Sequence, residues 1–240
     1  RHTRCARWSR GLGDVYKRQV KGVFCAGDAS GASSHKFSSG SHAEGRISGK
    51  AAIRYLVNEK PAKPDVSDAE VEALKTATYK PLATFEENQS ASTQADVNPN
   101  YIRPDMFMRR LQKIMDEYAG GVTAQFTTSK PMLDKGLELL AFLQEDSEKL
   151  GAEDLHELMR CWEYYHRMFQ ALAHVHTVLY REETRWPGYY FRSDFPKINE
   201  DDWHCFVNCK YDAATSKWDV MKRDIIHTFK AADEHEQLGG

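Results

Sequence analysis

Helical periodicity over residues 104–183 constrains the fold of this chain more than any other feature of its sequence. Apolar residues recur at helix spacing in 104–118, where Pro104 suits the first turn, and again in 131–150 and 152–183. The residues predicted to line the apolar faces are Phe107, Leu111, Ile114, Tyr118, Leu133, Leu137, Leu140, Leu143 or Phe142, Leu155, Leu158, Trp162, Tyr165, Phe169, Leu172 and Leu179. Three such helices pack most simply as a small antiparallel bundle, so the sequence predicts a mostly α protein of the α+β class.

The C-terminal segment has a different pattern. Residues 185–223 are rich in aromatic residues and turn formers, and the runs WHCFVNCKYD and SKWDVMK flank the turn-like AATS. Two such runs around a short turn predict a β-hairpin against the bundle. The aromatic residues from Trp186 to Phe195 are expected to pack this segment onto the helices, and the polar tail after Ile226 is expected to fray.

A short strand followed by a helix is predicted near the N-terminus. VKGVFCAG, residues 20–27, is apolar and β-favouring and ends in glycine, which is typical of a short buried strand. A helix-like run extends from about Ser41 to Asn58, and Gly45 and Gly49 would let that helix approach a sheet closely. The sequence therefore predicts a strand, a loop and a helix in this region.

The joining stretch GDASGASSHKFSSGSHAEGR, residues 27–46, carries the main binding signal. A strand end, a Gly/Ser loop and a helix start together offer N–H groups and hydroxyls to a polar or anionic ligand. Asp28 is placed to accept hydrogen bonds from sugar-like hydroxyls. The alternative is a polar loop that caps the helix through Ser39 or Ser41, and the pattern alone leaves both interpretations open.

Composition excludes several classes of protein. The 33 Lys and Arg residues nearly balance 35 Asp and Glu, which gives no sign of a nucleic-acid or membrane surface. No apolar run approaches the roughly 20 residues of a membrane-spanning helix. The cysteine count of 5 is odd, which favours reduced thiols in the cytoplasm over a disulfide framework. A globular cytoplasmic protein is expected.

The first residues are set aside from fold reasoning. The segment SRGLGDVYKRQ, Ser9–Gln19, resembles a translated sequencing-library adapter. Its GLGDVY lacks the third glycine and the preceding strand of a dinucleotide-binding fingerprint. Residues 1–19 are therefore expected to be a leader artefact, and the chain from Val20 onward is expected to be a piece of a longer protein.

No metal site is predicted. Cys205 and Cys209 follow His204, but no second CxxC or His pair stands at zinc spacing, and strand alternation accounts for both cysteines. His174 and His176 are two positions apart on a helix and so face different directions. Hydrogen-bonded or solvated histidines are the expected outcome.

The chain is expected to divide into successive regions. A possible capping box of Ser67 and Glu70 starts a short helix, and residues 87–100 read as a loop. The expected regions are the leader 1–19, the end of a ligand-binding domain 20–60, a linker 61–101, the helical bundle 102–184 and the aromatic C-terminal segment 185–240.

Several strings of the chain resemble one family of flavoproteins. GVFCAGDASGASSHKFSSGSHAEGR resembles the closing FAD segment of flavoproteins related to fumarate reductase and succinate dehydrogenase. Within that group, the string SSHKFSSGS is similar to the adenylylsulfate (APS) reductase alpha subunits. RLQKIMDEYAGGVTA, DLHELMRCWE and ETRWPGYYFRSDFPKINEDDW extend the resemblance to about Arg223. It implies the C-terminal piece of an FAD-binding α/β domain, followed by the bundle and the hairpin.

The resemblance also implies residue roles. Gly27 and Asp28 would meet the ribityl and pyrophosphate region of FAD. The residues implied to begin the helix that points at the isoalloxazine ring are Ser38, Ser39, Gly40 and Ser41. Lys36 aligns with a substrate-facing arginine of fumarate reductase relatives, with His35 beside it, so these two are the implied catalytic residues.

The implied activity is the interconversion of APS with sulfite and AMP, with electrons supplied through an iron–sulfur beta subunit that carries the clusters. Lys36 in place of arginine argues against fumarate chemistry, because lysine lacks the planar guanidinium group that binds a carboxylate through two hydrogen bonds. Gly188 and Arg192 match the family's GAHxR-type turn only loosely. A fumarate reductase-type flavoprotein and a non-catalytic helical interaction module stay open as alternatives, and the chain alone is expected to be inactive.

Overall fold

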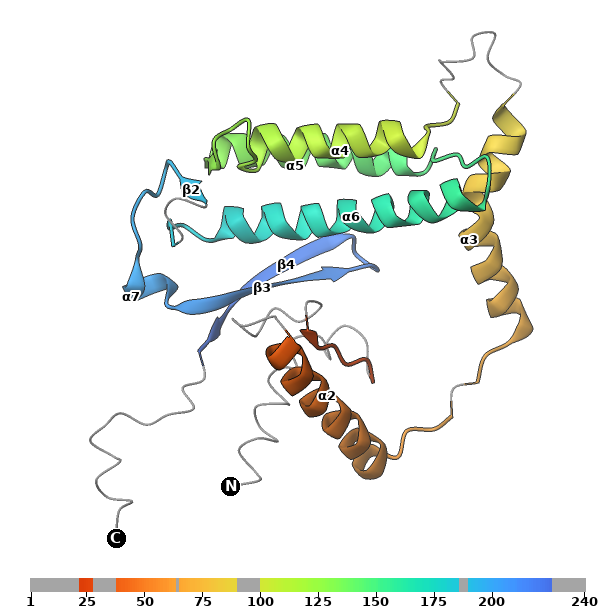
Figure 1. Cartoon of the computed structure of the whole chain (residues 1–240), viewed down its shortest axis with the longest axis horizontal. Coiled ribbons are helices and arrows are strands. Elements are labelled where there is room, and N and C mark those ends of the chain that lie inside the picture. Colours follow the sequence, from red (N-terminus) through yellow and green to blue (C-terminus); the bar gives the residue numbers. More distant parts are fainter. Residues whose placement is uncertain (1–21, 28–37, 64, 90–99, 186–189, 226–240) are drawn as a thin grey trace. The chain divides into compact units, whose positions relative to one another are not determined.

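The computed structural model describes residues 22–27, 38–63, 65–89, 100–185 and 190–225. These residues belong to two compact units, one within residues 1–67 and one within residues 68–240. The first unit contains helix α2, and the second contains the elements from α3 to β4 (Figure 1).

In the first unit, α2 (Ser38–Glu59) begins earlier than predicted. Neither Ser39 nor Ser41 therefore sits at the N-cap, since both lie inside the helix. An added Cβ at Gly45 or Gly49 would meet no described atom within 4 Å. The predicted close packing of these glycines is therefore not found among the described residues.

The predicted strand at 20–27 is wrong for the part of it that the structure describes. Residues 23–26 adopt no regular secondary structure, and Val23 is 51% exposed. A strand is stabilised by hydrogen bonds to a neighbouring strand, and none of the described strands pairs with this segment. Its backbone instead hydrogen-bonds to side chains of α2.

The second unit is built on the helices α4 (Pro104–Tyr118), α5 (Lys130–Ser147) and α6 (Leu155–Tyr180). Consecutive helices run in opposite directions, and each contacts the other two (Figure 1). Asp154 caps α6, because its Oδ1 accepts the N–H of Glu157 at 2.8 Å. The predicted antiparallel bundle is confirmed. Within the described ranges, no helix is both long and apolar enough to cross a bilayer.

The core of the bundle follows the predicted apolar faces with one exception, Leu155. Its buried residues include Phe107, Leu111, Leu133, Leu140, Leu143, Leu158, Cys161, Met168, Leu172 and Val175. Phe142 is 55% exposed and Leu155 is 68% exposed. Phe142 lies about 200° around the helix from Leu140, whereas Leu143 lies on the same side as Leu140. The sequence left Leu143 and Phe142 as alternative core residues, and the structure shows that Leu143 is the one in the core.

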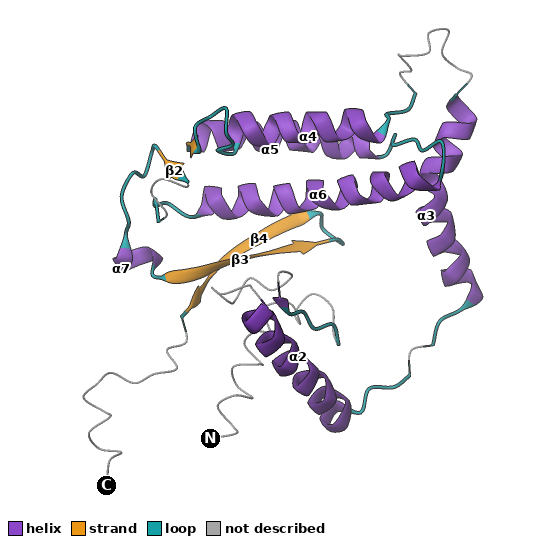
Figure 2. Cartoon of the chain, in the orientation of Figure 1, coloured by secondary structure: helices purple, strands orange, loops and turns teal. Residues whose placement is uncertain are grey.

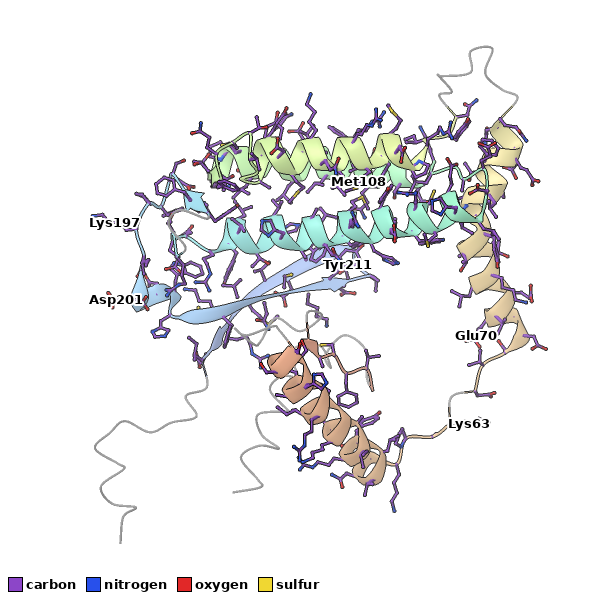
Figure 3. The ribbon with its side chains drawn as sticks, in the orientation of Figure 1. Lys63, Glu70, Met108, Lys197, Asp201 and Tyr211 are labelled. Atoms are coloured by element: carbon purple, nitrogen blue, oxygen red, sulfur yellow. The ribbon has the colours of Figure 1, made fainter. Side chains whose placement is uncertain are left out.

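α6 buries a second face against a C-terminal hairpin. β3 (Cys205–Asp212) and β4 (Lys217–Asp224) pair antiparallel in a register from Cys205↔Asp224 to Asp212↔Lys217, which confirms the predicted hairpin (Figure 2). The ring of Phe169 lies 5.3 Å from that of Tyr211 and 6.4 Å from that of Trp218. Figure 3 shows Tyr211 on the side of the hairpin that faces α6. Aromatic contacts thus hold the hairpin on the helix.

α3 (Asp68–Asn88) is longer than the short helix predicted there, and it continues through Pro81. A proline inside a helix removes one backbone hydrogen bond. Contacts with the chain just before α6 and with α6 itself hold α3 here: the carbonyl of Pro81 accepts the N–H of Ala152 at 2.9 Å, and the carbonyl of Thr78 accepts the N–H of Trp162 Nε1 at 2.9 Å. Tertiary contacts therefore extend the helix beyond its local sequence signal.

Short elements connect the ends of the helices. β1 (Thr127–Thr128) precedes α5, β2 (Phe191–Arg192) follows α6, and the two strands pair in parallel. α7 (Glu200–Trp203) then leads into β3. The pairing brings the chain after α6 back to the beginning of α5.

We expect Phe107→Ala to lower the free energy of unfolding by about 3–5 kcal/mol, because it leaves a cavity in the bundle core. Phe107 is 0% exposed. Urea denaturation of the chain, followed by far-UV circular dichroism, measures the change. Phe142→Ala is the matched control and should cost less than about 1 kcal/mol. Equal losses for the two variants would contradict the assigned core.

Candidate functional site

The segment 22–27 runs antiparallel to α2. At its beginning, the rings of Phe24 and Tyr55 meet edge to face with their centroids 6.1 Å apart. Further along, Ser48 Oγ donates to the carbonyl of Cys25 at 2.8 Å. Later residues of the segment thus contact residues of α2 that lie closer to its N-terminus. The segment therefore ends beside the first turns of α2.

Gly27, the last residue of this segment, is held against the helix by a charged side chain. Its N–H donates to Glu44 Oε2 at 2.7 Å, and Glu44 is only 6% exposed. The φ angle of Gly27 is +67°, a conformation that favours glycine, and an added Cβ would lie 3.4 Å from Ser41 Oγ. The backbone at Gly27 therefore passes close to the start of α2.

The first turn of α2 is composed of Ser38, Ser39, Gly40 and Ser41. Ser38 and Ser39 are exposed, Gly40 and Ser41 are half-buried, and this turn contains no acidic residue. The first N–H groups of a helix point out of its N-terminus and carry the positive end of its dipole. The turn is therefore suited to an electron-rich or anionic group.

The structure thus places one predicted binding residue, Gly27, beside the predicted helix start. Asp28, His35 and Lys36 lie outside the described residues. The roles of all these residues in binding and catalysis stay predictions.

Sequence reasoning missed Glu44 and Ser48, which hold the segment in place. A signal was available in their spacing. Ser41, Glu44 and Ser48 recur three and four positions apart, so they share one face of α2. A polar stripe on one helix face, in a segment expected to be packed, indicates side chains that bind a neighbouring backbone.

A second polar cluster joins the ends of α5 and α6. Arg192 is 1% exposed, and its Nη1 donates to the carbonyls of Val178 at 2.5 Å and Arg181 at 2.9 Å, at the end of α6. Its Nε and Nη2 each donate to the carboxylate of Asp194 at 2.8 Å. Asp194 Oδ2 also accepts the N–H of Lys130, which begins α5, at 2.8 Å. The pair therefore places a cation at one helix C-terminus and an anion at another N-terminus, both favourable for the helix dipoles.

Glu183, which is 3% exposed, anchors the chain that follows α6. It accepts hydrogen bonds from Arg181, from Arg185 Nε at 2.7 Å and from the N–H of Asn199 at 3.0 Å. Burial by itself raises the pKa of Glu183, but these hydrogen bonds outweigh burial and lower it. The ionised carboxylate thus fixes the fold here, while Gly188 lies outside the described residues.

Four cysteines lie among the residues that the structure describes. Cys25, Cys161, Cys205 and Cys209 form no disulfide. Burial raises the pKa of the Cys161 thiol to about 12. Cys209 Sγ lies 3.8 Å from the carbonyl of Ala173, which places this cysteine on the α6 side of the hairpin. Among the described residues, no group of three His, Cys, Asp or Glu side chains is arranged to hold a metal ion.

The chain is similar to proteins of known function. The adenylylsulfate reductase alpha subunit of Megalodesulfovibrio gigas is 48% identical over 213 residues, which are 88% of this chain and 32% of that protein. Two solved structures match with a TM-score of 0.84 and 52% identity, over 89% of this chain and 33% of theirs. One is adenylylsulfate reductase from Archaeoglobus fulgidus, and the other is adenosine-5-phosphosulfate reductase in complex with sulfite as a covalent adduct. This chain therefore spans about a third of the length of these relatives.

A family model described as the fumarate reductase flavoprotein C-terminal region matches residues 108–235. The matched residues include α5, α6 and the hairpin, and they make up more than half of the chain. The similarity to the solved structures covers more of the chain than this family model does.

Asp194→Asn is expected to lower the free energy of unfolding at pH 7 by about 1.5–3 kcal/mol, because it weakens hydrogen bonds to the buried Arg192. Hydrogen bonds from Arg192 and from the N–H of Lys130 outweigh burial and lower the pKa of Asp194. A carboxyl with a lowered pKa stabilises the fold fully above its unfolded pKa of about 3.9, and this stabilisation is lost as pH falls through the folded pKa.

The difference between wild type and Asp194→Asn should therefore shrink as the pH falls below about 4. Urea denaturation at a series of pH values measures it. Asp201→Asn is the control, since Asp201 is exposed on α7 (Figure 3). A difference that stays constant down to pH 3 would argue against the assigned ion pair.

Proposed function

The chain belongs to the fumarate reductase flavoprotein C-terminal family, and we propose that it is the C-terminal third of the FAD-carrying alpha subunit of an adenylylsulfate reductase. The observation that carries this proposal is the identity of 48–52% to such proteins over 88–89% of the chain. The complete enzyme would interconvert APS with sulfite and AMP.

The start of α2 and the close approach of Gly27 support a site for a flavin nucleotide, with Asp28 as the proposed acceptor. The start of α2 offers N–H groups and the hydroxyls of Ser38 and Ser39, with no acidic side chain in the first turn. Gly27 brings the backbone close to this turn and leads directly into Asp28. A site for a dinucleotide needs both features, because its phosphates and ring require close backbone approach and its sugar hydroxyls require an acceptor.

FAD supplies the two-electron chemistry when it is bound, and the protein supplies orientation and charge. In this assignment, Asp28 accepts hydrogen bonds from hydroxyl groups of the cofactor. The first turn of α2 directs its N–H groups at the ring edge, where they favour negative charge. The neutral, small side chains of Gly40 and Ser41 permit close approach.

His35 and Lys36 are assigned to the substrate side. Lys36 supplies a point charge for the anionic sulfate or phosphate of APS, and His35 donates a hydrogen bond beside it. Both residues lie in the segment that joins Gly27 to α2. This assignment favours APS over fumarate, because a dicarboxylate is best held by the planar fork of arginine.

The proposal also includes an iron–sulfur beta subunit as the electron partner and a cytoplasmic location. Both depend on the activity assigned to the complete enzyme. The relatives support the alpha-subunit assignment, since one is subunit alpha of an adenylylsulfate reductase and another is a reductase in complex with sulfite.

The complete protein expressed from the intact gene is expected to be yellow and to show flavin absorbance. After anaerobic photoreduction, APS should reoxidise the flavin and fumarate should not, as followed by absorbance near the flavin maximum. Reoxidation by fumarate instead would favour the fumarate reductase alternative. A colourless complete protein would favour the non-catalytic interaction module.

Substitution of His35 or Lys36 by alanine should slow this reoxidation about tenfold or more, because each removes a hydrogen bond to a charged substrate. The flavin content of the purified protein should stay unchanged, since neither residue is assigned to the cofactor. Stopped-flow absorbance at increasing APS concentrations measures the rate. Lys50→Ala is the control, because Lys50 is exposed on α2. Wild-type rates in both alanine variants would refute the assigned roles.

A further inference from the structure

A buried carboxylate lies directly behind the backbone that enters the proposed flavin site. Glu44 is on the second turn of α2, and it is 6% exposed. Its Oε2 accepts the N–H of Gly27 at 2.7 Å, and Gly27 directly precedes Asp28. The charged group therefore acts on the position of the backbone next to the assigned cofactor ligand.

Burying the side chain of Glu44 has a free-energy cost that its contacts must offset. A carboxylate that is removed from water costs free energy unless hydrogen bonds compensate it. The contact with Gly27 is short and charge-assisted, which makes it about twice as strong as a bond between neutral groups. A strong bond to one backbone N–H restricts the direction in which the chain continues.

Gly27 is the point at which this restriction matters most. Its φ angle of +67° lies in the left-handed region, and glycine loses more backbone freedom on ordering than any other residue. Without a fixed partner for its N–H, the backbone of Gly27 would sample several directions. The bond to Glu44 selects one of them.

The second tether of the segment acts further away. Ser48 Oγ donates to the carbonyl of Cys25 at 2.8 Å, and this neutral bond is two residues before Gly27. It holds the segment on α2 at Cys25, whereas the bond to Glu44 acts on Gly27 itself. Substitution of Ser48 therefore tests attachment of the segment to α2, and substitution of Glu44 tests the position of Gly27.

We propose that Glu44 is a positioning residue for the flavin, because it fixes the backbone of Gly27 beside the first turn of α2. This inference rests on the proposed function. The carboxylate acts through its reach and its acceptor oxygen, and it does not itself touch the cofactor.

The test uses the complete flavoprotein with the variants Glu44→Ala, Glu44→Asp, Glu44→Gln and Ser48→Ala. FAD is removed and then titrated back, with quenching of its fluorescence reporting the Kd and visible circular dichroism reporting its orientation. Glu59→Ala is the matched control, because Glu59 is an exposed glutamate on the same helix. Melting temperatures of the apoproteins record any general loss of stability.

Glu44→Ala and Glu44→Asp should raise the Kd for FAD about tenfold or more and change the visible circular dichroism, because alanine has no acceptor and aspartate is too short. Glu44→Gln should raise the Kd clearly less than Glu44→Asp does, since its amide oxygen can still accept the N–H of Gly27, although this bond is no longer charge-assisted. Ser48→Ala should lower the apoprotein melting temperature while changing the Kd less than threefold, roughly half a power of ten. This order separates positioning from general stabilisation.

The inference is overturned if Glu44→Asp and Glu44→Ala bind FAD as tightly as Glu59→Ala does, or if Glu44→Gln is as weak as Glu44→Asp. Should Glu44→Ala not fold, the pair Glu44→Asp and Glu44→Gln decides the question, because both keep a polar side chain at this position. A wild-type complete protein that binds no FAD would instead refute the proposed function, and this inference with it.

Discussion

The second unit depends on the burial of α6 on two sides at once. One side, which includes Met168 and Val175, packs into the bundle and is almost completely buried. The other side presents Phe169 to the rings of the hairpin. α3, α4, α5, β3 and β4 all contact this helix, so the position of each element is defined relative to it. A helix with apolar residues around most of its circumference has to be covered on all of these sides.

The ends of the helices are fixed by charge rather than by apolar packing. The carbonyls at the end of α6 are orphan acceptors, and Arg192 satisfies two of them while it binds Asp194 bidentately. Asp194 in turn satisfies an orphan N–H at the start of α5 through Lys130. A buried ion pair is favourable only when nearly all of its hydrogen bonds are made, and here both partners find them at helix ends. This arrangement defines where α6 ends and where α5 begins. Apolar contacts along the lengths of the helices do not define these positions.

Elements whose causes lie within one segment of the sequence could be predicted, and elements that depend on distant residues could not. The three helices of the bundle and the hairpin are encoded by periodicity within each segment, and the sequence predicts them correctly. The extension of α3 through Pro81 depends on Ala152 and Trp162, which are far away in the sequence, and so the prediction fell short. The strand predicted at 20–27 failed because strand formation needs a partner that the pattern cannot supply. In the candidate site, glycine and serine composition indicated the region, but the role of Glu44 appears only when Gly27 is placed against α2.

The geometry of the first unit gives a reason for the assigned catalytic segment to lie between Gly27 and Ser38. Gly27 is packed beside Ser41, so both ends of the segment 28–37 are fixed at the same end of one helix. Bringing the two ends of a loop together costs entropy, and here the contacts of Gly27 with α2 already hold these ends together. In the proposed function, the first turn of α2 is assigned to the cofactor, and the buried Glu44 is the side chain that holds Gly27 beside this turn.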